Sequence, residues 1–272
     1  RDVRRLNGNN DLTCQVFPKN ITTYREATRW LKSHTGYNPT DTNAPFRVIN
    51  DFEQQLLGML PARLFRKMTF DEVRRLQLDI ETYTSPGFDF PNAAREEDRI
   101  IMIALRDNTG WEECLTGTRM SEAEMLTEMI KRIQERDPDI IEGHNIFDFD
   151  LCYIAARCKQ HSIKLALGRD GSTVSMRSSR FTAGEQTVTY TRCDVFGRHI
   201  VDTMHLTRLY DITFRGLQSH SLKTVAKHFN VAAPERTYIA GERISQVFDE
   251  SPDELERYAM DDVRETAAIS NI

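Results

Sequence analysis

The 272-residue sequence has no apolar run that approaches the roughly 18 residues needed to span a bilayer. It also has no charged start followed by an apolar segment, so neither a signal peptide nor a membrane partner is expected. Its five cysteines are odd in number and never occur as C-x-x-C. A structural zinc site and a disulfide framework are therefore not expected, whereas a reducing cytosolic or nuclear setting is.

The chain has no excess of positive charge, with 36 Lys and Arg against 41 Asp and Glu and a formal net charge of −5. A nucleic-acid binder usually has a basic face, which this balance does not indicate. A site that holds cations needs carboxylates of its own, however, so the net charge excludes nothing. Hydrophobic residues at 39% and charged residues at 28% predict an ordinary globular protein rather than a disordered chain.

No repeat or low-complexity tract divides the sequence, but its pattern changes near residue 71. Residues 1–70 predict a small α/β segment, with a strand in LTCQVF and helices in TYREATRWLKSH and INDFEQQLLGML. Residues 71–272 predict one larger domain. Because the chain begins at Arg1 and its last residues, VRETAAISNI, favour a helix still in progress, we expect it to be a piece of a longer protein.

From residue 71 the sequence predicts strands that alternate with helices. The predicted strands are RRLQLDIET, RIIMIALRD, WEECLTG and IIEGHN. Predicted helices run from a Ser121/Glu124 capping box to Asp137-Pro138, over 149–160, over SLKTVAKHF and from Ser251-Pro252-Asp253-Glu254 onward. A loop is expected over 168–185, followed by an inserted β-hairpin with TVTYTR and RHIVD as arms. The pattern predicts an α/β fold, a mixed sheet with helices on both faces, which resembles the ribonuclease-H-like outline.

Two acids, Asp79 and Glu81, lie two residues apart in a predicted strand and therefore point to the same face. On an edge strand such a pair can equally be a solvated face. The flanking residues favour a buried strand instead, because a strand that opens a buried α/β sheet is apolar on both sides. Two adjacent like charges would repel, and a divalent cation would remove that cost.

A second group, Asn145, Asp148 and Asp150, lies at the join between a predicted strand and helix. Taken alone, these residues favour structural capping over chemistry. Asp148 stands where a helix N-cap belongs, and an acid at 150 would suit the first turn of the helix. The join nevertheless lies at the carboxyl end of a strand, where open α/β sheets bind their ligands.

The third group is in the last predicted helix, where Tyr258 and Asp262 share one face and Asp261 points away. By default Asp262 would be a surface acid paired with Arg257 or Arg264, and the tyrosine a core residue. Together the three groups supply four carboxylates and a tyrosine. That set suits two hard divalent cations about 3.5–4 Å apart, which would clamp the oxygens of a phosphodiester.

The segments RLQLDIET, HNIFDFDLCYI and YAMDDV resemble, in order, the three exonuclease motifs of family B DNA polymerases. These belong to the tyrosine-bearing branch of the DEDD (DnaQ-like) exonucleases. The similarity extends to LFRKMTFDEVRRLQLDIET at the domain entry, and to HIVDTMHL and SHSLKTVAKHFNV later. It covers roughly residues 50–272, and the three motifs are specific only jointly.

The resemblance implies that Asp79, Glu81, Asp150 and Asp262 hold two divalent cations, Mg²⁺ or Mn²⁺, with Asp79 between the two metals. In the family the second-motif acid lies five residues after the Asn, which selects Asp150 over Asp148. Tyr258 is similar to the tyrosine that orients the attacking water. The implied activity is in-line hydrolysis of the terminal phosphodiester, releasing a nucleoside 5′-monophosphate.

The resemblance also implies partners. These are a DNA 3′ end, single-stranded or as a frayed primer, and a polymerase domain expected after residue 272 of the same chain, for which this region would proofread. A monomer is expected, in the cytoplasm with the nucleoid of a bacterium or in the nucleus of a eukaryote. Residues 1–70 would be part of a polymerase N-terminal domain.

Contacts to DNA are expected from the second motif and from the loop at 168–185. Arg177 and Arg180, with Arg169, could reach phosphates from that loop, although a solvated loop is the commoner outcome. Phe147 and Phe149 could stack on a terminal base, with at least one of them expected in the core. Asn145 is a further candidate contact. By analogy, the predicted hairpin lies where family B polymerases keep a hairpin that helps to separate the primer end.

Three other functions remain open on the sequence. The chain could be a catalytically silent DNA-binding or scaffolding module, although no catalytic position of the motifs is missing. It could be a free-standing exonuclease of repair or RNA processing. A calcium-stabilised structural domain is the third, but the sequence has no D-x-D-x-D-G loop of the EF-hand kind.

Overall fold

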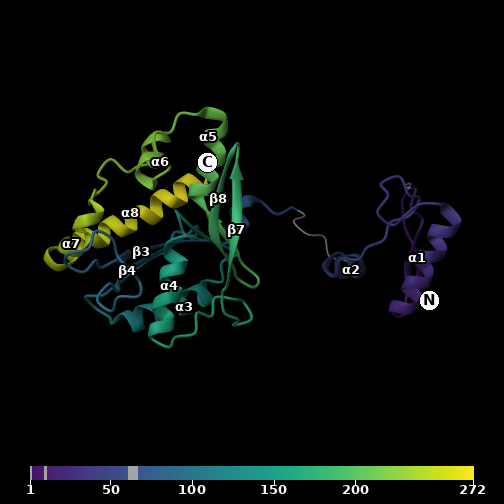
Figure 1. Ribbon diagram of the computed structural model, residues 1–272, viewed down its shortest axis with the longest axis horizontal. Coiled ribbons are helices and arrows are strands. Elements are labelled where there is room, and N and C mark those ends of the chain that lie inside the picture. The colour runs from purple at the N-terminus through teal and green to yellow at the C-terminus, as the bar shows by residue number, and fades with distance from the viewer. Residues whose placement is uncertain (1, 9–10, 61–66) are drawn as a thin grey trace. The chain divides into compact units, whose positions relative to one another are not determined.

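The computed structural model describes residues 2–8, 11–60 and 67–272. The chain divides into two compact units, Arg1–Met68 and Thr69–Ile272 (Figure 1). The division falls close to the change of pattern at residue 71, and the assignment of the first unit to a polymerase N-terminal domain stays a prediction. The first residues of the expected domain entry, 64–66, lie outside the described residues.

The first unit contains two strands and two helices. Strand β1 (Asp2–Arg5), which was not predicted, pairs antiparallel with β2 (Cys14–Phe17). Helix α1 (Ile21–Thr35) begins at Asn20, whose side chain accepts a hydrogen bond from Thr23 N, and helix α2 (Phe52–Met59) begins at Asp51 in the same way. The strand and both helices predicted for this segment are confirmed.

The second unit is organised around a mixed five-stranded sheet in the order β5-β4-β3-β6-β9. These strands are β3 (Arg75–Thr82), β4 (Ile100–Asp107), β5 (Glu112–Thr116), β6 (Ile140–Gly143) and β9 (His199–Asp202). The first three pair antiparallel, whereas β6 and β9 run parallel to β3. A short turn over 108–111 joins β4 to β5, whereas a longer connection over 83–99 leads from β3 to β4. Helical crossovers lead to the parallel strands.

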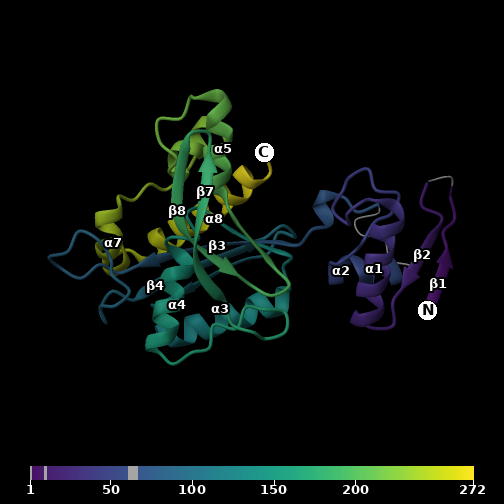
Figure 2. The same cartoon turned by 45° about the vertical axis from the view of Figure 1, so that its right-hand side comes forward.

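Helices cover both faces of this sheet, as predicted (Figures 1 and 2). One face packs against α3 (Glu122–Arg136) and α4 (Asp150–Gln160), and Leu76, Leu78 and Ile80 of β3 lie in that core. The other face packs against α7 (Ile244–Glu250) and α8 (Pro252–Ser270), and Ile101 and Ala104 of β4 lie in this second core. The ribonuclease-H-like arrangement is confirmed.

Period-two alternation decides where the acids of β3 point. Because Leu78 and Ile80 face α3 and α4, Asp79 and Glu81 face α8. Strand β6 pairs with β3 only along residues 75–77. Beyond that point β3 keeps its partner β4 but has an open edge towards α4.

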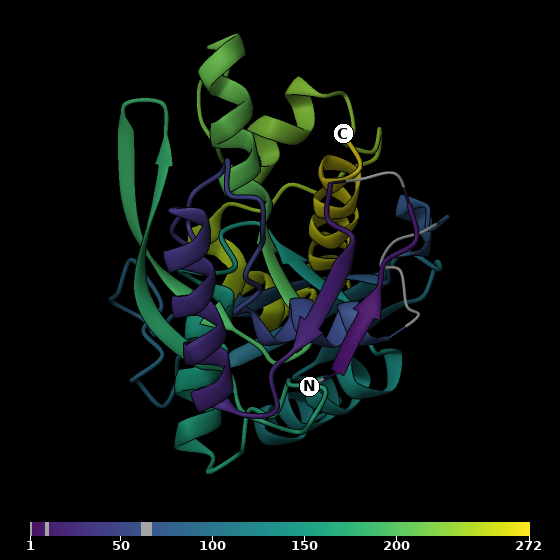
Figure 3. The same ribbon diagram turned by 90° about the vertical axis from the view of Figure 1, so that its right-hand side faces the viewer.

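The inserted hairpin is present, but its arms differ from those predicted. It consists of β7 (Ser175–Ala183) and β8 (Gln186–Asp194), which form a separate two-stranded sheet, and Figure 3 shows it projecting beside α5 (Thr203–Phe214). The prediction of a loop through residue 185 was wrong, and so was RHIVD as an arm, since 199–202 form β9. The arm SMRSSRFTA has few apolar residues, so it lacks the hydrophobic alternation that indicates a strand.

The remaining elements are helical. Helix α6 (Leu222–His228) and α8 were predicted, whereas α5, α7 and the short 3₁₀ helices η1 (Phe70–Glu72) and η2 (Gly241–Arg243) were not. Among the helices described, none is long and apolar enough to cross a membrane.

Candidate active site

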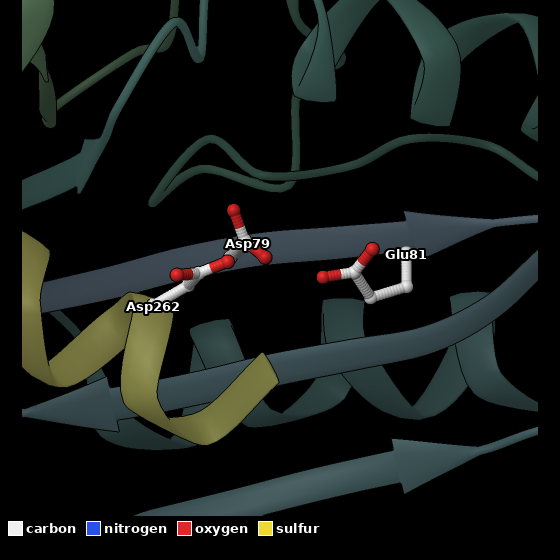
Figure 4. A group of neighbouring side chains, drawn as sticks. All are labelled: Asp79, Glu81 and Asp262. Carbon is white, nitrogen blue, oxygen red and sulfur yellow. The ribbon is translucent and has the colours of Figure 1, made fainter. Parts of the chain in front are cut away.

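Three of the predicted carboxylates meet on the α8 face of the sheet. Asp79 and Glu81 of β3 and Asp262 of α8 each offer an oxygen atom, and these three atoms lie within 4.8 Å of one another (Figure 4). The residues come together because the face of β3 that carries the acids packs against α8, which supplies the third acid from about 180 residues later in the sequence.

Asp150 adjoins this group without being one of the three. It is the first residue of α4 and is 2% exposed, and its Oδ1 accepts a hydrogen bond from Ile80 N at 3.1 Å. This contact uses the open edge of β3, between Asp79 and Glu81. The negative charge of Asp150 acts on Asp79, whose pKa it helps to raise.

The four carboxyl groups lie close enough for their negative charges to repel one another. Burial, followed by repulsion from the neighbouring acids, raises the pKa of Asp79 well above its ordinary value, and burial is also the main cause of the raised pKa of Glu81. Burial raises the pKa of Asp150 to about 7 and that of Asp262 to about 6. A set of buried and partly buried oxygen ligands that repel one another fits hard divalent cations, which would cancel the repulsion.

Two basic residues that the sequence did not single out lie at the cluster. Lys223 Nζ on α6 donates to the Tyr258 hydroxyl and, at 3.3 Å, to Ile239 O. Its positive charge opposes, without cancelling, the rise in the pKa of Asp79. Arg236, in the segment between α6 and η2, donates to Asp262 Oδ1. Lys223 lies in the segment SHSLKTVAKHFNV that resembles the family, which was the available signal for it, whereas Arg236 lies outside every quoted segment.

The sequence left open whether Tyr258 belongs to the core or to the proposed site. Its ring is buried in the core beneath α8, and the residue is 6% exposed. Its hydroxyl reaches the site and accepts a hydrogen bond from Lys223. Burial and the charge of Asp262 raise its pKa far above the ordinary value, so the phenol stays protonated.

Asp262 is not the surface acid that its position in the sequence, taken alone, predicts. It is 6% exposed and pairs with Arg236. Arg264 pairs instead with Asp261 at 3.2 Å and with Glu112 at 2.6 Å. Asp261 Oδ2 also lies 3.6 Å from Arg236 Nη1, so both acids contact the same guanidinium, and the prediction that Asp261 points away from Asp262 stays a prediction.

The capping interpretation of Asp148 was wrong, whereas Asp150 lies in the first helical turn as expected. Phe149 occupies the N-cap position without a side-chain cap, and Asp148 Oδ1 instead accepts from Thr191 N of β8 at 3.0 Å. Asn145 has a positive φ of 68°, and its backbone N–H donates to Asp202 Oδ1 at 2.9 Å. The structure therefore gives this segment a tight turn that starts α4 beside the open edge of β3.

The two phenylalanines of the second motif differ in exposure. Phe147 is 7% exposed, and its ring lies 5.0 Å from that of Tyr190 and 5.8 Å from that of His205. Phe149 is partly buried, with its ring 5.6 Å from Tyr153. Phe147 is thus the core residue of the pair, which leaves Phe149 as the candidate for base stacking.

Arg177 and Arg180 lie on strand β7 rather than in a loop, and both are exposed. Arg177 Nε pairs with Asp194 Oδ2 at 3.0 Å. In the described part of the chain Arg180 forms no ion pair, so it is the freer of the two for phosphates. Arg169 pairs with Asp137 and Asp139, at 2.7 and 2.6 Å, so its guanidinium is already engaged and is a poorer candidate for binding phosphates.

Comparison with known proteins adds an independent line of evidence. The family model described as DNA polymerase family B, exonuclease domain, matches residues 57–225. This match includes Asp79, Glu81 and Asp150, whereas Tyr258 and Asp262 lie beyond it.

Similar proteins include two archaeal DNA polymerases. The one from Archaeoglobus fulgidus is 38% identical over 133 residues, which are 49% of this chain and 16% of that protein. The one from Desulfurococcus sp. (strain Tok) is 29% identical over 210 residues, or 72% of this chain and 24% of that protein. A solved structure, the family B DNA polymerase from the hyperthermophilic archaeon Pyrobaculum calidifontis, has a TM-score of 0.58 and 27% identity over 73% of this chain and 24% of that one. The chain spans less than a quarter of the length of these proteins.

Proposed function

This chain belongs to the exonuclease-domain family of the family B DNA polymerases, and on this basis we propose that it is a 3′→5′ exonuclease acting on DNA. The reaction is hydrolysis of the terminal phosphodiester with release of a nucleoside 5′-monophosphate. One observation carries the proposal: Asp79, Glu81 and Asp262 offer oxygens within 4.8 Å of one another, with Asp150 beside them.

The four carboxylates are proposed to hold two divalent cations, Mg²⁺ or Mn²⁺. When bound, such ions neutralise charge on the phosphodiester and lower the pKa of the attacking water. Asp79 is repelled by each of the other three acids, which supports a position between the two metals. The burial of Glu81, Asp150 and Asp262 and the partial burial of Asp79 support a site where water is limited and electrostatic interactions are strong.

Tyr258 is proposed to orient the attacking water rather than to remove its proton. Its raised pKa keeps the phenol protonated, which makes it a poor base. A lysine ammonium only donates, so the hydrogen bond from Lys223 occupies a lone pair of the tyrosine oxygen. The hydroxyl hydrogen is then available to a water molecule or a phosphate oxygen.

The biological setting is proposed to be proofreading within a longer family B DNA polymerase. The proteins named above are DNA polymerases, and this chain spans less than a quarter of each. The partners would be a frayed or single-stranded 3′ end and a polymerase domain of the same chain. The hairpin with exposed Arg180, and Phe149, would contact the DNA, with Asn145 a further candidate.

Product analysis tests the proposal. The chain is incubated with a single-stranded DNA oligonucleotide and Mg²⁺ or Mn²⁺, and the released products are separated by chromatography. Nucleoside 5′-monophosphates, formed successively from the 3′ end and absent in EDTA, are expected. Binding of DNA and metal without any product would favour the catalytically silent module instead.

A further inference from the structure

Arg236 makes several contacts with one stripe of helix α8. Its Nη2 donates to Asp262 Oδ1 and its Nε donates to Glu265 Oε1 at 2.8 Å. Its guanidinium carbon lies 4.9 Å from the centre of the Tyr258 ring. Tyr258, Asp262 and Glu265 are spaced i, i+4 and i+7, so they lie on one face of the helix. One buried cation thus touches two residues of the proposed site and a neighbour that is not part of it.

Contacts outside the site fix the orientation of this guanidinium. Nη1 donates to Thr237 O at 2.5 Å and lies 3.6 Å from Asp261 Oδ2, and the ring of Tyr238 is 5.4 Å from the guanidinium carbon. The side chain of Arg236 is only 1% exposed. Because these contacts do not involve Asp262, the arginine would keep its place whether or not a metal binds.

Asp262 retains coordinating capacity despite this pairing. An ionised carboxylate has two oxygens and about four lone-pair sites, and the hydrogen bond from Arg236 uses one of them. Figure 4 shows one oxygen of Asp262 on the side of Asp79. An arginine is suited to this task because its planar fork donates in several fixed directions, which a lysine ammonium cannot reproduce.

We propose that Arg236 is a positioning residue of the metal site, which orients the Asp262 carboxylate towards Asp79 and is itself anchored by Glu265. This inference rests on the proposed function, because it assigns a role towards the metals that the carboxylates would hold. Arg236 acts through Asp262 and does not touch the substrate. Partners that orient metal-ligating groups in this way contribute substantially to metal affinity.

The test compares Arg236→Lys and Glu265→Gln with the wild-type chain by calorimetric titration of Mn²⁺ without DNA. Arg198→Lys is the matched control. Its side chain is also 1% exposed and pairs with Asp137 at 2.8 Å, at the amino-terminal end of β9 and away from the cluster. Circular dichroism establishes that each variant is folded. If Arg236→Lys does not fold, Glu265→Gln carries the test, because it removes the anchor and leaves Arg236 and Asp262 intact.

Arg236→Lys is expected to weaken Mn²⁺ binding about 10–100-fold, the usual effect of losing an outer partner of a metal ligand. Glu265→Gln should shift the affinity in the same direction by less, and Arg198→Lys should leave it unchanged. With DNA, excess Mn²⁺ should restore the activity of Arg236→Lys while the KM for DNA stays at the wild-type value.

Folded Arg236 and Glu265 variants that bind Mn²⁺ with wild-type affinity would overturn the inference. Tighter binding would also overturn it, since Arg236 would then be a counter-ion that competes with the metal. An equal loss in Arg198→Lys would attribute the effect to general destabilisation, with the same consequence. Failure of the wild-type chain itself to bind Mn²⁺ would instead refute the proposed function, and the two failures are thereby distinguished.

Discussion

The Asp150 carboxylate accepts a hydrogen bond from the backbone N–H of Ile80, at 3.1 Å, between the two acids of β3. This contact joins the first residue of α4 to the part of β3 that β6 leaves unpaired. One side chain therefore does two things: it satisfies a buried backbone donor at the strand edge, and it brings a fourth negative charge to the site.

The two tasks of Asp150 can be separated by substitution. In Asp150→Asn the amide oxygen can still accept from Ile80 N, so we expect nearly wild-type stability at pH 5, where the wild-type carboxyl is mostly protonated without metal. The Mn²⁺ affinity should fall at least about 100-fold, the upper end of the effect of losing an outer partner of a metal ligand. Asp150→Ala should also lose about 1–3 kcal/mol of unfolding free energy, because the Ile80 donor is left unsatisfied. Calorimetry and urea denaturation measure the two effects. Equal stability of Asn and Ala variants would contradict this account.

Repulsion among the acids should make the metal-free protein less stable than it could be. Asp79→Asn removes a buried charge that each of the other three acids repels, so it should raise the melting temperature in EDTA. Each kcal/mol gained corresponds to about 2–4 °C for a domain of 150–250 residues. Mg²⁺ should raise the melting temperature of the wild-type chain but have much less effect on the variant. A variant that melts lower than wild type in EDTA would show that the repulsion is already relieved.

The raised pKa values predict a specific dependence on pH. In the folded chain the pKa of Asp150 is about 7 and that of Asp262 about 6, whereas an unfolded Asp titrates near ~3.9. The folded state therefore holds protons that the unfolded state has lost. The contribution of these groups to stability is complete below pH ~4 and is lost as the pH rises through 6 to 7.

Two partly buried histidines, His144 and His205, have pKa values lowered by desolvation, and they contribute a slope of the opposite sign. The measurement is therefore the difference between wild type and Asp150→Asn in urea denaturation with EDTA at pH 5 and pH 8. Wild type should lose more stability than the variant on going to pH 8. Mn²⁺ affinity of the wild type should rise over the same interval, because binding must release the protons. Parallel pH profiles of the two proteins would contradict the assignment.

The two phenylalanines of the second motif should respond differently to truncation. Phe147→Ala removes a buried ring and should cost about 3–5 kcal/mol of unfolding free energy. Phe149→Ala should cost less, because the ring is only partly buried, and should weaken single-stranded DNA binding by about 1–3 kcal/mol if it stacks on a base. Denaturation and fluorescence anisotropy with a labelled oligonucleotide measure these effects. A Phe149→Ala variant with unchanged DNA affinity would remove the stacking proposal.

The sequence predicted those features that depend on local periodicity. Alternation along β3 is sufficient to place Asp79 and Glu81 on one face of the strand. Helical spacing is sufficient to place Tyr258 and Asp262 on one face of α8. Assigning them to one site required the resemblance to a known family. The structure then brings three of the four acids within 4.8 Å of one another.

Features that depend on contacts between distant segments were not predictable in this way. Lys223 and Arg236 reach the cluster from α6 and from the following segment. The residues around Lys223 resemble the family without indicating this contact, and nothing near Arg236 indicates its contact. Asp148 looked like a helix cap because an acid before a helix usually is one, but the hairpin supplies Thr191 N as a tertiary donor instead. The first arm of that hairpin is mostly polar, so its strand is defined by pairing with β8 rather than by its own pattern.

The central claim is tested most directly with a 5′-labelled primer that carries a 3′ mismatch, incubated with Mg²⁺ or Mn²⁺. The wild-type chain is compared with Asp79→Ala/Glu81→Ala, which removes two of the clustered acids. A ladder that shortens from the 3′ end, absent in the variant and in EDTA, is the predicted result. No shortening of mismatched or single-stranded DNA at high protein concentration, with Mn²⁺ shown to bind, would contradict the exonuclease assignment.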